Sequence, residues 1–348
     1  MKSFSKLILS LVLISFFSSY AIAEGTSNSK DNLASKNEEI HELTVFVVPT
    51  KYTLDWSTPS TICKTMRKCY VKSMGLKINY LLGHVALRIN TPLLPEPLYF
   101  AQTSLSTPEK TKLILKDKVG FGIMGHTLSG GIEPHESLAA KLPHYAGKNM
   151  LTFIKFRITK EAAQRVLDFY TEYSRKLEDG HASCNYYGGH FWPRYEQEGG
   201  ACSTFGMSVL DLINLLDEEY TRVWKVQRKI PMELIGGKLN NGKKVKTSTI
   251  KKTHHWYEGD GKVNVDYAPY FVFEPNVIFD WILKKREANS SEYLPIVENG
   301  VPGLYFDATD VKVDVNAPLF LERPQTNIFI DYHRKRTNFT PKMVSSNN

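Results

Sequence analysis

The stretch Gly199-Gly200-Ala201-Cys202-Ser203-Thr204-Phe205 places a cysteine after two glycines, at the start of an apolar helical pattern. Apolar residues then recur at three- and four-residue steps, which predicts a helix with one buried face: Phe205, Val209, Leu212, Ile213 and Leu216. Cys202 would lie in the first turn, where unpaired backbone N–H groups favour a thiolate and can stabilise an oxyanion. The stretch predicts a nucleophile or, alternatively, a buried or disulfide-bonded cysteine at a helix start.

Residues 82–89 are expected to form a strand, because apolar residues alternate along them. One face carries Val85, Leu87 and Ile89, and the opposite face carries His84, Ala86 and Arg88. The apolar face belongs in the core, so His84 points the other way, beside a small alanine that leaves room for a substrate. An imidazole there can take the proton of a thiol and return it to a leaving group. The alternative is a polar, half-exposed strand residue.

Together these stretches resemble the permuted papain-like superfamily, the circularly permuted relatives of NlpC/P60 peptidases that include the YiiX-like and lecithin:retinol acyltransferase-like groups. The matching pieces are Gly83-His84-Val85-Ala86-Leu87 and Gly200-Ala201-Cys202-Ser203-Thr204-Phe205. Between them, residues 158–164 look like the family's strand followed by a helix, capped by Thr159 and running to about Glu178. The resemblance covers roughly residues 43–220 and implies an α+β fold with an antiparallel sheet packed on helices.

The resemblance also implies roles for individual residues. Cys202 would be the nucleophile, His84 the base and then the acid, and a third polar residue would orient the imidazole. Gln102 is the first choice for this third residue, on an expected strand over residues 97–103, because its amide oxygen can accept the second imidazole N–H. Glu96 and His126 are the alternatives. The chain departs from the family because this strand contains no histidine or glutamate.

The N-terminus has the pattern of a cleavable signal peptide over residues 1–23. Lys2 and Lys6 precede an apolar run, and Ala21-Ile22-Ala23 supplies a small-x-small cleavage site. Residues 24–42 are polar and charged and are expected to form a flexible linker. We therefore expect a periplasmic or secreted protein.

Four cysteines in an exported chain ordinarily indicate two disulfides. Cys63 and Cys69 are close enough in sequence for a local bridge, which leaves Cys184 and Cys202 as the second pair. Two histidines, His181 and His190, lie near that second pair, but their spacing is too wide and irregular for a zinc site. No metal or cofactor is expected.

Composition is that of a globular protein, with 42% hydrophobic and 12% aromatic residues. The formal net charge of +8 suits contact with anionic envelope polymers or lipid, and equally an ordinary soluble exported protein. No nucleic-acid-binding signature is present, and at most peripheral membrane contact is expected. We expect a catalytic domain over residues 43–220 and a mixed α/β accessory region over residues 221–348.

These features and the resemblance lead to one functional hypothesis and one alternative. The first is an exported cysteine hydrolase or acyltransferase that acts on an amide or ester, with a peptidoglycan peptide amide as the first substrate and a lipid as the second. The alternative is a non-enzymatic envelope binding protein in which Cys184 and Cys202 form a disulfide. The redox state of these two thiols distinguishes the hypotheses.

Overall fold

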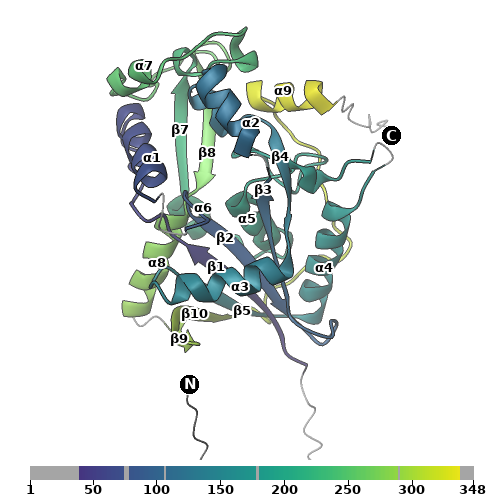
Figure 1. Cartoon of the computed structure of the whole chain (residues 1–348). Coiled ribbons are helices and arrows are strands. Elements are labelled where there is room, and N and C mark those ends of the chain that lie inside the picture. The colour runs from purple at the N-terminus through teal and green to yellow at the C-terminus, as the bar shows by residue number, and fades with distance from the viewer. Residues whose placement is uncertain (1–38, 74–77, 106, 178–179, 289–290, 338–348) are drawn as a thin grey trace, which may run out of the picture. The chain divides into compact units, whose positions relative to one another are not determined.

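The computed structural model describes residues 39–73, 78–105, 107–177, 180–288 and 291–337. Within these residues the chain is α+β: an eight-stranded mixed sheet with helices packed on it, and a separate two-stranded ribbon (Figure 1). The expected signal peptide, residues 1–23, and nearly all of the expected linker, residues 24–42, lie outside the described part. No helix of that part is long and apolar enough to span a membrane.

The strands of the large sheet are β1 (His41–Val48), β2 (His84–Asn90), β3 (Leu98–Ser104), β4 (Leu128–Glu133), β5 (Thr152–Ile158), β6 (Tyr186–Tyr187), β9 (Leu294–Glu298) and β10 (Val301–Asp307). The ribbon consists of β7 (Lys225–Pro231) and β8 (Tyr267–Phe273). The α-helices are α1 (Pro59–Ser73), α2 (Thr107–Thr111), α3 (His135–Ala146), α4 (Lys160–Ser174), α5 (Cys202–Leu212), α6 (Glu218–Trp224), α7 (Thr247–Lys252), α8 (Pro275–Glu287) and α9 (Ile328–Thr337). A π-helical turn, η1 (Lys112–Lys116), continues α2.

The large sheet has the order β6-β4-β3-β2-β1-β5-β10-β9. Every neighbouring pair is antiparallel except β5 and β10, which run parallel. Among the strands that precede residue 220, where an antiparallel sheet was expected, every pair is antiparallel; the sheet is mixed because β10, from the chain beyond residue 220, joins it in parallel. Parallel neighbours need a crossover connection, and here the whole chain between Ile158 and Val301 supplies it.

The chain beyond residue 220 contributes directly to this sheet. Strands β9 and β10 complete it on one side, and α8 packs against β1, β5 and β10. Residues 39–348 accordingly form one compact unit, with no separation at the expected boundary near residue 220.

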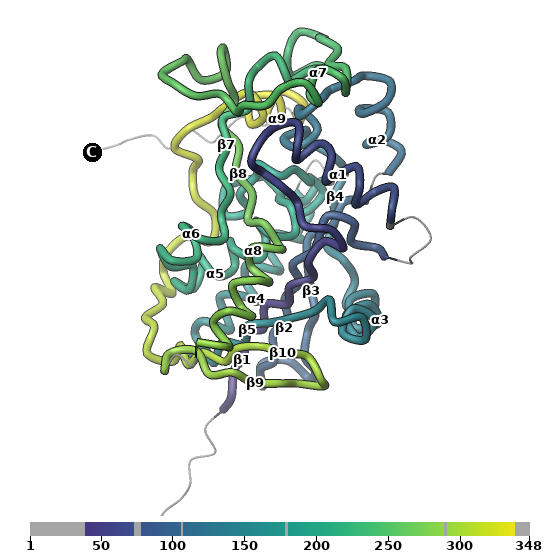
Figure 2. The backbone as a smooth tube through the Cα atoms, turned by 90° about the vertical axis from the view of Figure 1, so that its left-hand side faces the viewer, coloured from purple at the N-terminus to yellow at the C-terminus, as the bar shows by residue number. Residues whose placement is uncertain are grey.

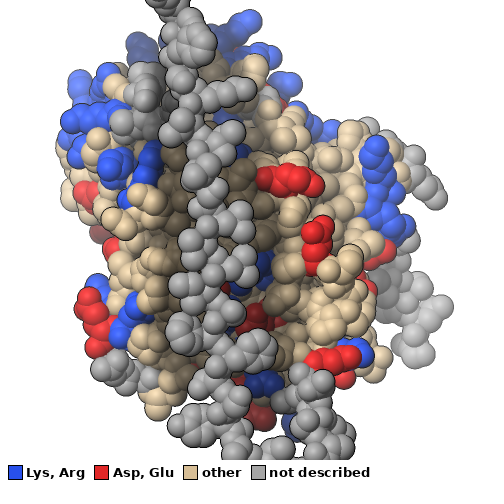
Figure 3. Space-filling view, turned by 60° about the horizontal axis from the view of Figure 1, so that its bottom comes forward, with Lys and Arg blue, Asp and Glu red and all other residues tan. Residues whose placement is uncertain are grey.

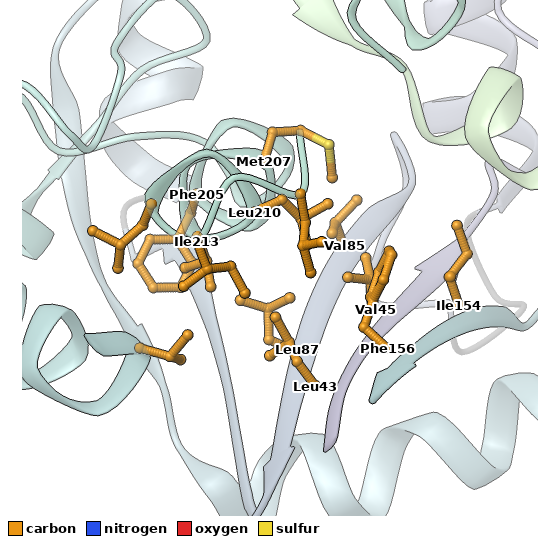
Figure 4. Packing of buried hydrophobic residues seen from close by; sticks show 14 of the residues in the cluster. Leu43, Val45, Val85, Leu87, Ile154, Phe156, Phe205, Met207, Leu210 and Ile213 are labelled. Atoms are coloured by element: carbon orange, nitrogen blue, oxygen red, sulfur yellow. The ribbon is translucent and has the colours of Figure 1, made fainter. Parts of the chain in front are cut away.

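One face of the sheet carries the main hydrophobic core. Alternate apolar residues of β1, β2 and β5 point toward α4, α5 and α8, and Figure 4 shows α5 lying over β2 with its apolar side chains directed at the strands. The two elements approach closely at Gly206, where a Cβ would lie 2.7 Å from Val85 Cγ1. This contact fixes the start of α5 against the beginning of β2.

The opposite face packs on α3. Its cluster contains Phe46 and Phe153 from the strands and Leu138 and Tyr145 from the helix. Ala86 and Ala101 lie on the same face and are fully buried. Because their side chains are small, larger polar groups at the neighbouring strand ends have room to meet above them.

A third layer lies at the end of the molecule where α1, α7 and α9 surround the β7–β8 ribbon (Figure 2). This layer has its own hydrophobic cluster, which includes Ile62, Ile230, Ile250 and Phe329. A hydrogen bond from Ser60 Oγ to the Lys251 carbonyl, 2.8 Å, joins α1 to α7. The layer therefore holds α1 beside α7, although about 175 residues separate them in the sequence.

Candidate active site

Cys202 is delivered to the start of α5 by a tight backbone path. Gly199 has φ +61°, and a Cβ there would lie 2.0 Å from the Tyr186 carbonyl oxygen, so that only glycine fits. The Thr204 hydroxyl accepts a 2.9 Å hydrogen bond from the Ala201 N–H and thereby caps the first turn. As the sequence predicts, Cys202 is the first residue of the helix.

His84 lies against Cys202, and a hydrogen bond joins the two side chains. Both are buried: 9% of Cys202 and 3% of His84 is exposed. Burial raises the pKa of the Cys202 thiol, but the charge and hydrogen bond of His84 outweigh it, with help from the backbone N–H groups of Val85 and Ser203, and the pKa is lowered. The site therefore favours a thiolate.

The same pair sets the protonation of the histidine. Burial lowers the pKa of His84, but the Cys202 thiolate and then Glu133 oppose it and raise the pKa to about 9. The two shifts together favour a thiolate–imidazolium ion pair over a neutral thiol and a neutral imidazole. Such a pair combines an ionised nucleophile with a proton ready for a leaving group.

Glu133, at the end of β4, is the third member of the cluster. Its Oε2 lies 3.2 Å from Nε2 of His84, with both side chains almost fully buried. Among the described residues neither atom has another hydrogen-bond partner. Because Glu133 faces Nε2, Nδ1 is the ring nitrogen available to the sulfur, and the carboxylate holds the imidazole in that orientation.

The other carboxylate oxygen of Glu133 is held by three donors. Oε1 accepts hydrogen bonds from the Tyr80 hydroxyl at 2.8 Å, the Ser137 hydroxyl at 3.1 Å and Lys141 Nζ at 2.6 Å. Burial raises the pKa of Glu133, but the hydrogen bond and charge of His84, followed by the hydrogen bonds of Lys141 and Tyr80, lower it to about 2. Glu133 is therefore ionised at any physiological pH.

Tyr80 also fixes the plane of the imidazole. Its ring stacks on His84 with centroids 3.9 Å apart and an interplanar angle of 8°. The Tyr145 hydroxyl in turn accepts hydrogen bonds of 2.9 Å from the backbone N–H groups of Asn79 and Tyr80. The ring of His84 is thus fixed by the tyrosine across its face and by Glu133 at its edge.

Gln102 does not orient His84, so this expectation is wrong. It lies on β3 as expected and is fully buried, but its Nε2 donates to the carbonyl oxygens of Cys184 at 2.8 Å and Tyr186 at 3.2 Å. Gln102 therefore ties β3 to the segment that leads into the cysteine helix, a structural role.

Neither alternative to Gln102 lies in the cluster. Glu96 is exposed in the turn before β3. His126 is buried elsewhere, with Nδ1 3.1 Å from the Thr127 carbonyl oxygen and its ring edge-on to Tyr332. Glu133 stood in a stretch whose glycines and neighbouring proline are typical of a loop. The sequence feature that could have identified Glu133 is its position between a short strand, β4, and the helix that follows, α3.

Two further side chains border Cys202 and were not expected from the sequence. The Tyr187 hydroxyl lies within hydrogen-bonding range of the Cys202 backbone N–H. Lys110, on α2, has its Nζ 5.5 Å from the centre of the Tyr187 ring. Burial lowers the pKa of Lys110, and the negative charge of the Cys202 thiolate partly opposes this shift. The Tyr187 side chain therefore lies between Lys110 of α2 and the start of α5.

All four cysteines are free thiols. The expected bridges between Cys63 and Cys69 and between Cys184 and Cys202 are absent. The first two lie six residues apart within α1, and on a helix this spacing does not place them on the same face. Cys202 faces His84 instead of Cys184, which is buried in the main core.

The histidine-rich segment before α5 forms no metal centre. His190 is buried, and its Nε2 pairs with the Asn327 side-chain amide. Within the described residues, no group of three His, Cys, Asp or Glu side chains is placed to hold a metal ion. Comparisons of the chain with protein-family models, curated proteins and solved structures find no match.

Proposed function

We propose that this chain is an exported cysteine hydrolase or acyltransferase with a permuted papain-like core. The observation that carries the proposal is the buried line of Cys202, His84 and Glu133, which lowers the pKa of the thiol and supplies a protonated imidazole beside it. The histidine precedes the cysteine in the chain, the order expected of a permuted core. An amide or ester is the substrate class, with a cell-wall peptide amide as the first candidate.

The chemistry follows from the ion pair. The Cys202 thiolate attacks the substrate carbonyl carbon and forms a C–S bond, while negative charge develops on the carbonyl oxygen. The backbone N–H groups at the start of α5 stabilise that oxygen. When the tetrahedral intermediate collapses, the bond to the leaving amine or alcohol breaks, and the His84 imidazolium gives it a proton.

In the second half of the reaction the acyl group is transferred from Cys202 to an acceptor, and His84 acts as a base. Neutral His84 takes a proton from water or another acceptor, whose oxygen or nitrogen attacks the thioester carbon. The C–S bond breaks and the thiolate–imidazolium pair is restored. Glu133 stays ionised throughout and stabilises the imidazolium whenever it forms.

An electrophilic acyl probe tests this proposal. We expect rapid covalent labelling of one residue, Cys202, in the non-reduced protein, and loss of labelling in Cys202→Ala. Cys63→Ala is the matched control, because Cys63 is a half-buried free thiol in α1. It should leave labelling unchanged, and peptide mass mapping locates the modified residue.

Two outcomes would contradict the proposal. Labelling that persists in Cys202→Ala would place the reactive group elsewhere. Labelling of Cys202 that requires prior reduction would show a disulfide with Cys184, and the chain would then be a non-enzymatic envelope binding protein.

A further inference from the structure

Positive charge is concentrated at one end of the molecule. Four segments lie there: α1, residues 105–118 with α2 and η1, residues 238–252 with α7, and α9 (Figures 1 and 2). They contain 17 Lys and Arg but three Asp and Glu, whereas the whole chain has 44 and 36. The remainder of the chain is therefore net acidic, and the excess positive charge of the protein comes from this end.

The contacts among these segments hold them together as one surface. The Ser60 hydroxyl joins α1 to α7, and Arg336 of α9 pairs with Glu109 of α2 at 3.0 Å. Figure 3 brings forward the opposite end, where Asp and Glu side chains lie among Lys and Arg. The field of the molecule is thus strongly asymmetric, with a positive pole at this end.

Large apolar side chains project from the same surface. Leu105, Ile114 and Leu115 are 65%, 48% and 69% exposed. Leu115 and Thr111 line a shallow groove of about 550 Å³ along α2 and η1, and lysines flank it. A protein rarely leaves neighbouring leucine and isoleucine side chains in water unless they meet an apolar partner.

We propose that this end, defined by α1, α2–η1, α7 and α9, docks on an anionic lipid surface. The lysines would contact lipid head groups, while Leu105, Ile114 and Leu115 would enter the acyl boundary. Charge alone would fit an anionic polymer as well. The exposed leucines and isoleucine among the lysines favour lipid, because a soluble polyanion offers nothing apolar for them to contact.

The docking surface lies on the same side of the protein as the candidate active site. Lys110 lies on α2, the helix that carries the apolar groove, and its ammonium group stands over Tyr187, which borders Cys202. Docking would therefore bring the site to the membrane side of the protein.

Vesicle co-sedimentation tests the docking itself. We expect the protein to bind vesicles of phosphatidylglycerol and phosphatidylcholine, and to bind pure phosphatidylcholine much more weakly. Ile114→Ser with Leu115→Ser should weaken binding about tenfold or more, because less apolar surface enters the lipid. Lys112→Gln with Lys116→Gln should weaken binding about tenfold and reduce its dependence on salt.

The matched control is Leu294→Ser with Val297→Ser. These side chains, on β9, are 50% and 63% exposed, but they lie at the opposite end of the molecule. They should leave binding unchanged. All variants keep the same N-terminus, so any lipid affinity of residues 1–23 contributes equally to each.

Three results would overturn the docking proposal: equal binding to both vesicle types, equal loss from both apolar double variants, or no loss from Ile114→Ser with Leu115→Ser. The last result, combined with loss from the lysine variants, would indicate a surface for a soluble polyanion. Acyl-probe labelling of Cys202 in the same variants separates this proposal from the enzymatic one, because labelling in solution does not require lipid binding.

Discussion

The lowered pKa of Cys202 depends on the charge and the hydrogen bond of the neighbouring His84 imidazole. Three negative or electron-rich groups act on that imidazole, namely the thiolate, the Glu133 carboxylate and the face of Tyr80. Because burial alone would favour a neutral thiol and a neutral imidazole, the ion pair exists only while its partners stay in place. Removing Glu133 should therefore change the titration of a sulfur that it does not touch.

Glu133→Gln is the variant that tests this dependence. We expect the pKa of His84 to fall and that of Cys202 to rise, since the amide cannot compensate the imidazolium charge. Turnover should fall by about 10²- to 10⁴-fold. The measurement is the rate of iodoacetamide alkylation of Cys202 across a pH series. The wild-type rate should remain high well below the ordinary thiol pKa of about 8.5, whereas the variant rate should follow a higher pKa.

Gln102→Leu is the matched comparison. It leaves the buried Cys184 carbonyl oxygen without this donor, while the Tyr186 carbonyl oxygen keeps its hydrogen bond from the Gly200 N–H, so that the free energy of unfolding should drop by about 1–3 kcal/mol. The alkylation profile of the folded protein should keep the wild-type pKa. If Gln102→Leu shifted the profile and Glu133→Gln did not, Gln102 would be the orienting residue after all.

The sequence could reveal Cys202 and His84 as candidates but not their partner. The helix start and the alternating strand are local patterns, visible within about ten residues. Glu133 lies close to His84 because β4 pairs with β3 in the sheet. The sequence of β4 shows no alternation of apolar and polar residues, so this strand is not predictable from its own residues. Long-range pairing of this kind leaves no local signal.

Among the elements, α5 and β2 are the pair whose contact sets the site. Gly206 lets the helix approach Val85, one residue beyond His84, and Val85 is a stiff, β-branched side chain that cannot move aside easily. The distance between Cys202 and His84 therefore depends on a packing contact four residues along the helix.

Gly206→Ala should separate the two elements. Its Cβ would overlap Val85 Cγ1, so we expect a loss of about 1–3 kcal/mol in the free energy of unfolding and a weaker Cys202–His84 interaction. Val85→Ala in the same background frees the space and should restore the alkylation rate of Cys202, although not the full stability. A double variant no more reactive than Gly206→Ala alone would show that the contact does not position the site.

Several elements were predictable from their own residues. Thr159 caps α4 by accepting from the Ala162 N–H at 3.2 Å, as its position before the apolar pattern predicts, although the helix ends at Ser174 and not near Glu178. The basic C-terminal segment forms α9, with His333 buried against Tyr186 and Phe191. Tertiary contacts decide both outcomes, and they are not encoded in local periodicity.

At the scale of the whole molecule, the chain beyond residue 220 is part of the same sheet and hydrophobic core as the candidate site. Strand β10 covers the edge of β5, and Leu304 and Ile278 enter the main core with no exposed area. The sequence offers no local signal for this pairing, because the whole chain between Ile158 and Val301, which spans the expected boundary near residue 220, separates β5 from β10. A boundary drawn from changes in composition thus falls inside one structural unit.

A chain ending at residue 220 should consequently fail to fold. It would expose the β5 edge and the apolar residues that α8 covers, which favours aggregation. We expect no cooperative thermal unfolding by circular dichroism and no selective alkylation of Cys202, in contrast to a chain that ends after α9. A soluble, cooperatively unfolding 39–220 fragment would establish that region as an independent domain.

The late position of β10 and α8 also has a consequence in time. Pro275, the first residue of α8, sits behind the turn that precedes His84: a Cβ on Gly83 would lie 2.8 Å from it. During synthesis, the ribosome has released β2 and α5 long before these supports emerge. Until then the turn before His84 lacks its contact with Pro275, and β5 lacks its partner β10, so that the sheet around the cysteine–histidine pair is completed late in synthesis.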